Sequence, residues 1–131
     1  MKRIHVIVSS ALALLGSGSM AAAAGDAAAG EADFRVCKTC HQIGEGAKNF
    51  VGPELNGVVG RKAGTVAGYH YSDANKNSGI TWNEATLAKY LKHPREVVPG
   101  TKMAFPGLPS DEDIANVIAY LKQFGADGKK Q

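Results

Sequence analysis

The clearest hydrophobic pattern lies near the C-terminus, where apolar residues recur on one side of a helical repeat. These positions are Ile114, Val117, Ile118, Leu121 and Phe124. Their i, i+3, i+4, i+7 spacing predicts an amphipathic helix. Ser110 stands where an N-cap is expected, and the three acidic residues after it favour the positive end of the helix dipole. We expect Gly125 to end this helix as its C′ residue.

A second helix is predicted in the middle of the chain. Residues 81–84, Thr-Trp-Asn-Glu, fit a capping box with Thr81 at the N-cap and the glutamate at N3. Leu87, Tyr90 and Leu91 follow at helical spacing. The helix should end just before Pro94, because the residue preceding a proline avoids the helical region.

A third helical segment is predicted from Asp26 to Cys37. Gly30 and Phe34 stand four residues apart in it and therefore share one face. The sequence shows no internal repeat and no convincing strand pattern. The hydrophobic pattern therefore predicts an all-α fold.

Long loops separate these helices. Residues 44–68 are rich in glycine, and residues 98–109 contain three prolines and two glycines. Three helices joined by loops of this length make a poor core, and such loops are unusual in a compact domain unless they wrap something. A flat apolar cofactor would supply the missing core.

The first 24 residues have the pattern of a secretory signal peptide. Lys2 and Arg3 precede a mostly apolar run from Ile4 to Leu15, and small residues follow as far as Ala24. The apolar run is too short to span a bilayer. We therefore predict a signal peptide at 1–24, a single domain at 25–131, and export to the periplasm.

Removal of this leader changes the charge of the chain. The full sequence carries a net charge of +3, and loss of Lys2 and Arg3 leaves 13 basic and 12 acidic residues, a net charge of +1. No basic cluster with interleaved aromatic residues is present, so a nucleic-acid partner is not expected. A domain of this size has a modest apolar core and commonly needs a further staple.

The strongest chemical signal is the pentapeptide 37–41, Cys-Lys-Thr-Cys-His, which contains both cysteines of the chain. C-x-x-C-H is the attachment sequence of c-type haem. Two thiols three residues apart lie along one face of a helical turn and can add to the two vinyl groups of one haem. His41 would then supply the proximal imidazole.

Other interpretations of this pentapeptide remain open. A thiol redox pair usually lies in a βαβ setting, which the sequence does not predict. A structural disulfide between Cys37 and Cys40 would close very little chain. A zinc site would need a second pair of ligands, and no such pair follows. Haem attachment is the favoured interpretation.

Met103 is the candidate for the sixth iron ligand. A single methionine is usually a core filler. Here it is the only methionine after residue 24, and it lies in a loop rich in proline and glycine instead of on an apolar helix face. The rival ligands His70 and His93 have polar surroundings that favour surface positions.

The whole of residues 25 to about 124 resembles mitochondrial cytochrome c and the bacterial cytochrome c2 group. The motifs that carry the resemblance are Gly30 with Phe34, Cys37-x-x-Cys40-His41, Gly52-Pro53-x-Leu55-x-Gly57, Gly60-Arg61-Lys62, residues 71–77, Gly79-Ile80-Thr81-Trp82, Tyr90-Leu91, residues 99–103 and residues 118–121. The resemblance implies a small class I cytochrome c fold, with several helices and long loops around one covalent haem c held by Cys37 and Cys40. It implies His41 and Met103 as iron ligands.

The resemblance also implies roles for the residues around the haem. Pro53 would accept a hydrogen bond from the second ring nitrogen of His41, which fixes the ring. The other implied haem-binding residues are Arg61, Tyr71 and Trp82 around a propionate, Tyr90 near the methionine sulfur, and Thr101 and Asn75 in a polar cluster. The first and last helices are expected to cross at Gly30, Phe34, Val117 and Tyr120.

Two filled positions on iron favour an electron carrier over an enzyme. A peroxidase-like or gas-binding cytochrome would need an open position, and thiol exchange would need no haem. The resemblance implies a quinol-oxidising bc1-type complex as donor and a terminal oxidase or photosynthetic reaction centre as acceptor. The protein would be a monomer that contacts these membrane complexes only peripherally.

The chain departs from this family in the charges expected around the docking surface. The positively charged residues kept at the matching positions are Lys48, Arg95 and Lys102. The positions that are neutral or reversed are Val36, Phe50, Glu96, Pro109 and Ser110, and residues 111–113 add negative charge. We therefore expect docking to depend only weakly on charge.

Overall fold

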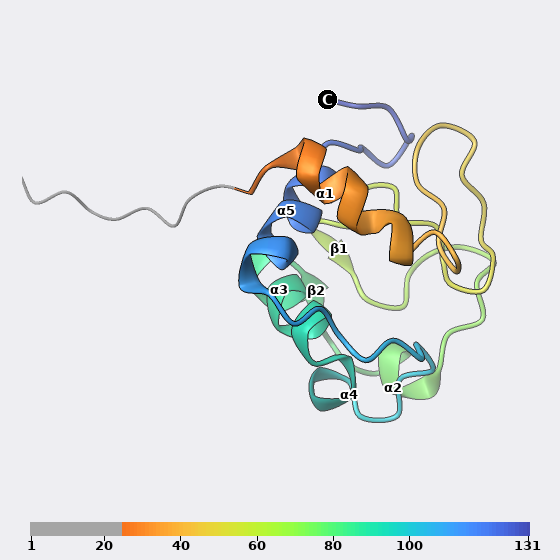
Figure 1. Ribbon diagram of the computed structural model, residues 1–131. Helices are drawn as coiled ribbons and strands as arrows, with labels where there is room; N and C mark the ends of the chain where they lie inside the picture. The colour runs from red at the N-terminus through yellow and green to blue at the C-terminus, as the bar shows by residue number, and fades with distance from the viewer. Residues whose placement is uncertain (1–24) are drawn as a thin grey trace, which may run out of the picture.

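The computed structural model describes residues 25–131, and the predicted signal peptide lies outside them. The elements in chain order are α1 (Ala27–Asp33), the 3₁₀ helix η1 (Phe34–Val36), β1 (Arg61–Lys62), α2 (Asp73–Lys76), β2 (Thr81–Trp82), α3 (Glu84–Lys92), α4 (Pro94–Val97) and α5 (Asp111–Lys122) (Figure 1). Within residues 25–131, every helix is too short or too polar to span a bilayer. The all-α prediction is confirmed, with one very short strand pair added.

The N-terminal helix begins where Asp26 caps it. The Asp26 carboxylate accepts hydrogen bonds from the backbone N–H groups of Ala28 and Ala29, at 2.9 and 3.2 Å. Its own N–H donates to Asn116 Oδ1 at 2.8 Å, which ties the start of α1 to α5. The predicted helical segment is confirmed, although its second part is the tighter helix η1.

Helices α1 and α5 cross at a close backbone contact. A Cβ atom at Gly30 would lie 1.8 Å from the carbonyl oxygen of Asn116, so only glycine allows this approach. Phe34 and Val117 are each 1% exposed at the crossing, and the rings of Phe34 and Tyr120 lie 5.2 Å apart. The crossing of the first and last helices is where the resemblance implied it.

The start of α3 differs from the sequence prediction. Asn83 caps this helix by accepting a hydrogen bond from Thr86 N–H at 2.8 Å. Thr81 belongs instead to strand β2, which pairs antiparallel with β1 in the register Arg61↔Trp82 and Lys62↔Thr81. Thr81 as N-cap and the absence of strands were therefore wrong, because a ladder two residues long is too short to leave a period-2 pattern.

The ends of α3 and α5 test two further predictions. Helix α3 ends before His93 as expected, and Pro94 then begins α4, where a missing N–H costs nothing. Ser110 caps α5 through a bond from Asp113 N–H. Gly125 as the C′ residue was wrong: Gln123 caps α5 in a right-handed conformation, and the chain then turns into a bridge between Phe124 and Lys130.

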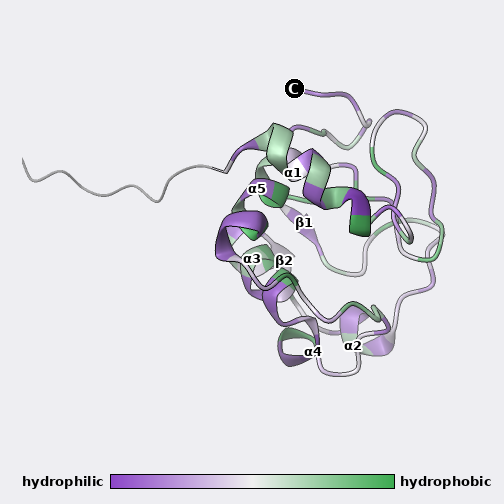
Figure 2. Ribbon diagram, viewed as in Figure 1, coloured by the Kyte–Doolittle hydropathy of each residue, from purple (hydrophilic) through white to green (hydrophobic). Residues whose placement is uncertain are grey.

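The helices gather on one side of the molecule and the long loops form the other. In Figure 1, α5 packs against both α1 and α3, while the segments after η1 and between β1 and α2 run around the opposite side. Figure 2 shows hydrophobic and hydrophilic residues alternating around α5, as expected for an amphipathic helix. The buried hydrophobic core includes Trp82, Leu87, Leu91, Ile114, Val117, Ile118 and Leu121. These helices hold the loops that carry the candidate site.

Candidate functional site

The pentapeptide 37–41 forms one turn that continues η1. The backbone carbonyl of Cys37 accepts hydrogen bonds from Cys40 N–H at 3.1 Å and from His41 N–H at 2.9 Å. Cys37 and Cys40 are not joined by a disulfide, and both side chains are half-buried. One turn therefore brings two thiols and an imidazole together, as C-x-x-C-H spacing predicts.

His41 is oriented by a hydrogen bond that it donates to the loop that follows. Its Nδ1 lies 2.7 Å from the carbonyl oxygen of Pro53, so this nitrogen is the donor and Nε2 keeps its lone pair. Burial lowers the pKa of the imidazole, and the bond to Pro53 only partly offsets this effect. The ring is therefore neutral, which is the form that ligates iron. Gly52 leaves room for it, since a Cβ there would lie 2.3 Å from His41 Cε1.

Met103 is held by a closed ring of polar contacts. Its N–H donates to Thr101 Oγ1 at 3.3 Å, the hydroxyls of Thr101 and Tyr90 are 3.1 Å apart, and Tyr90 O–H donates to Met103 Sδ at 3.6 Å. Since Tyr90 donates to sulfur, Thr101 donates to Tyr90. The Tyr90 ring lies 4.7 Å from the Trp82 ring, and both are buried. Four of the residues implied by the resemblance therefore come together.

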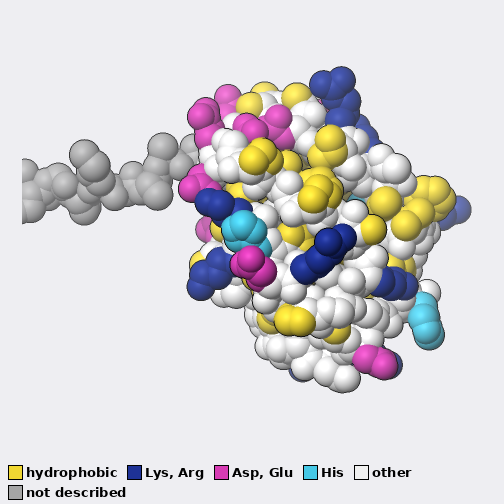
Figure 3. All heavy atoms as spheres, turned by 60° about the horizontal axis from the view of Figure 1, so that its bottom comes forward, with side chains coloured by type: hydrophobic (Ala, Val, Ile, Leu, Met, Phe, Trp, Pro, Cys, Tyr) yellow, Lys and Arg dark blue, Asp and Glu magenta, His cyan; other side chains and the backbone are white. Residues whose placement is uncertain are grey.

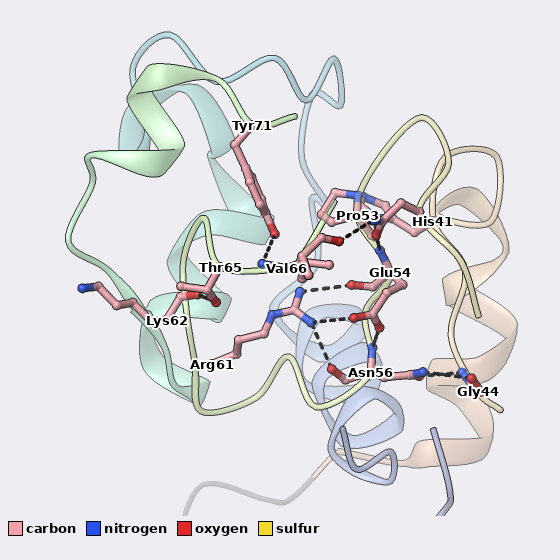
Figure 4. A network of polar contacts seen from close by, with 12 residues as sticks. His41, Gly44, Pro53, Glu54, Asn56, Arg61, Lys62, Thr65, Val66 and Tyr71 are labelled. Atoms are coloured by element: carbon pink, nitrogen blue, oxygen red, sulfur yellow. Dashed lines mark hydrogen bonds and ion pairs between the residues drawn. The ribbon is translucent and has the colours of Figure 1, made fainter. Parts of the chain in front are cut away.

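Arg61 makes polar contacts with one short segment (Figure 4). Its Nη1 donates to the carbonyl of Asn56 at 3.0 Å, and its Nη2 donates to the carbonyl of Glu54 at 3.1 Å. Glu54 Oε1 is a further 3.6 Å from Nη1. Trp82 lies beside Arg61 through the strand pairing, and Tyr71 Oη accepts from Val66 N–H at 3.1 Å. The structure thus places the three implied propionate partners around one region.

Asn75 supplies a test of whether the site fits a cofactor. Its Oδ1 is buried and has no hydrogen-bond partner among residues 25–131. An unpaired buried amide oxygen costs on the order of 1–3 kcal/mol, so native proteins rarely leave one. Asn75 lies in α2, which is capped by Ser72 and carries no other buried polar group without a partner. A polar group from outside the polypeptide would satisfy it.

The chemistry of the donor set fits haem c. The site offers two thiols for attachment, a neutral imidazole with a free nitrogen, and a thioether held in place. Burial, followed by the neighbouring Cys40, raises the pKa of the Cys37 thiol to about 11. No group of three or more His, Cys, Asp or Glu side chains within residues 25–131 is arranged to hold a metal, which disfavours zinc.

Two residues of the polar network were missed by sequence reasoning. Glu54 lies inside a quoted motif but received no role, and Asn56 was not considered. Asn56 is 8% exposed, and its side-chain amide accepts from Gly44 N–H at 2.7 Å and donates to Gly44 O at 2.9 Å. Two polar residues, Glu54 and Asn56, in a glycine-rich loop directly after Pro53 were the sequence signal that could have indicated this network.

Comparison with known proteins identifies the family of the chain. The cytochrome c family model matches residues 27–125. Cytochrome c-554 of Methylosinus trichosporium is 54% identical over 132 residues, covering 100% of both chains. Cytochrome c2 of Rhodoblastus acidophilus is 61% identical over 107 residues, covering 82% of this chain and all of that one. The solved structure of cytochrome cH from Methylobacterium extorquens has a TM-score of 0.71 at 52% identity and covers 76% of this chain and 99% of its own. The chain therefore belongs to the cytochrome c family, and Cys37 and Cys40 attach its haem c covalently.

Proposed function

We propose that this protein is a single-haem electron carrier of the periplasm, in which His41 and Met103 would hold the haem iron. The observation that carries the proposal is that both candidate ligands are supported by hydrogen bonds: the carbonyl of Pro53 orients His41, and Tyr90 with Thr101 holds Met103. The haem supplies one-electron chemistry by cycling its iron between Fe(II) and Fe(III).

The residues of the chain adjust this chemistry in two ways. A thioether with an imidazole gives a higher reduction potential than two imidazoles. Both ligands are fixed by hydrogen bonds, so the site needs little rearrangement when the charge on it changes. With His41 and Met103 both holding the iron, no position would be left open for peroxide or a gas, which favours a carrier over a peroxidase-like or gas-binding cytochrome.

The partners follow from the same proposal. A signal peptide at 1–24 would export the chain, and residues 25–131 would carry the haem. We propose a quinol-oxidising bc1-type complex as donor and a terminal oxidase or photosynthetic reaction centre as acceptor. The protein would act as a monomer.

The optical spectrum of the purified protein tests this function. We expect the mass of residues 25–131 plus one haem, a narrow c-type band of low-spin six-coordinate iron in the reduced protein, and no change on addition of carbon monoxide. In isolated membranes supplied with quinol, the added protein should become reduced. A high-spin spectrum that shifts with carbon monoxide would show an open position and contradict the carrier.

Large apolar side chains are exposed near the cysteines, in the region where the sequence has few of the basic residues expected from the resemblance. Val36, Phe50 and Val51 are 55%, 61% and 60% exposed, which is unusual for large apolar side chains. Val36 also lines a depression with Thr39 and Leu108. We propose that the acceptor makes apolar contact with this surface.

The depression beside Val36 is also lined by the charged residues Asp33, Arg35 and Asp113. Two of the lysines in the predicted docking region are engaged in contacts within the chain. The Lys102 ammonium donates to the carbonyl of His70 and lies 4.5 Å from the centre of the Tyr69 ring. Lys92 pairs with Asp111 at 2.6 Å. On the face drawn in Figure 3, acidic side chains gather near one edge, and Lys and Arg side chains lie apart from one another between hydrophobic ones. This arrangement favours weak electrostatic steering.

Electron transfer to the acceptor should therefore depend only mildly on salt. The net charge of residues 25–131 is +1, and two ionised haem propionates would bring it to about −1. We expect the bimolecular rate constant to fall less than about threefold between low and physiological ionic strength. Lys102→Glu should slow it most among single charge changes, and Lys129→Glu, an equal change in the C-terminal segment, should have little effect. A tenfold fall across the salt series would show that the remaining lysines steer docking.

A further inference from the structure

Glu54 is the acidic member of the Arg61 network and is largely shielded from water. Its side chain is 22% exposed, and that of Arg61 is 17% exposed. Glu54 Oε2 accepts the N–H of Asn56 at 2.7 Å, while Oε1 lies 3.6 Å from Arg61 Nη1. The carboxylate is therefore fixed on one side by the backbone and on the other by the guanidinium.

The same segment orients the proximal ligand. Glu54 directly follows Pro53, whose carbonyl accepts a hydrogen bond from His41 Nδ1 at 2.7 Å. Glu54 N–H donates a hydrogen bond to Asn49 Oδ1 at 3.0 Å, and the Asn56 side chain makes two hydrogen bonds with the backbone of Gly44. Figure 4 shows the contact between His41 and Pro53 beside the contacts that link Glu54, Asn56 and Gly44. A fixed negative charge thus stands one residue away from the group that holds the iron ligand.

Charges at this position act on the reduction potential. Reduction lowers the charge of the haem by one unit, so a nearby cation favours the reduced form and a nearby anion favours the oxidised form. Burial lowers the pKa of the Arg61 guanidinium. Arg61 is still cationic, because a guanidinium is not deprotonated in proteins. A carboxylate at 3.6 Å, in a region shielded from water, offsets much of the field of that cation.

We propose that Glu54 is a positioning residue that tunes the reduction potential. Its carboxylate offsets the charge of Arg61 and holds the potential below the value that Arg61 alone would give. This inference rests on the proposed function, because it concerns the potential of a haem ligated by His41 and Met103. It assigns a role to a residue for which the sequence and the family resemblance gave none.

Glu54→Gln in the haem-loaded protein tests this role, because glutamine keeps an oxygen acceptor for Asn56 N–H and loses only the charge. At a fixed ambient potential, the ratio of reduced to oxidised protein should rise roughly threefold to tenfold, as expected for one charge at an effective dielectric constant of about 20 or more. The matched control is Glu45→Gln, an exposed acidic residue of the same loop, which should change the ratio less than twofold. Equal ratios for the Glu54 and Glu45 variants would overturn the proposal.

A second variant separates charge from structure. Glu54→Asp keeps the charge and shortens the side chain, so its ratio should stay near that of the unchanged protein even if its stability falls. If Glu54→Asp raises the ratio as much as Glu54→Gln does, the effect comes from lost contacts and the tuning role is wrong. Carbon monoxide binding and the near-infrared band report independently on the ligation, so failure of the proposed function would be seen separately.

Discussion

Replacing Met103 with alanine is expected to remove the weak near-infrared charge-transfer band of the ferric protein and to lower its reduction potential. Met103 is the only methionine after residue 24, and Tyr90 and Thr101 hold its backbone and its sulfur. The potential should fall by on the order of 0.1–0.3 V, because axial ligands set haem potentials over about 0.8 V. Near-infrared absorption of the ferric protein and a spectroelectrochemical titration would measure both effects.

The matched control is the double change His70→Ala with His93→Ala. These are the only other histidines of residues 25–131 that could compete with Met103, and neither has a polar side-chain contact in that region. The band and the potential should be unchanged in this control. A band that survives in Met103→Ala, or disappears in the histidine variant, would contradict the ligand assignment.

The features that the sequence predicted well are those written in contiguous residues. The turn at 37–41 is local, so its spacing alone brings Cys37, Cys40 and His41 together. The N-cap of α5 is also local, because Ser110 bonds a backbone group three residues later. The pattern of α5 follows from the helical repeat. In these cases the partner of each residue lies within one turn of the chain.

The features that were missed depend on partners farther away. Thr81 fits a local capping box, but its pairing with Lys62 makes it a strand residue, so Asn83 becomes the N-cap. Glu54 gains its role only because the chain turns at Gly57 and Gly60, with φ of 64° and 97°, and returns Arg61 to it. Neither contact leaves a periodic pattern. Tertiary pairing therefore overrides local preference at these positions.

Replacing Gly30 with alanine is expected to destabilise the fold by roughly 3 kcal/mol or more, even though alanine favours helices by about 1 kcal/mol. The added Cβ would lie 1.8 Å from Asn116 O and 2.4 Å from Asn116 C, and backbone atoms inside α5 cannot give way as a flexible side chain can. Helices α1 and α5 would have to separate, which would open the packing of Phe34 against Tyr120. Guanidinium unfolding of the haem-loaded protein, followed by the Soret band, would measure the loss.

Gly46→Ala is the matched control. A Cβ there meets nothing within 4 Å, so only the positive φ of 78° at this position costs stability, by about 1–2 kcal/mol. If Gly30→Ala costs no more than this control, the two helices can move apart freely, and their crossing is not the contact that holds the haem-bearing loops in place.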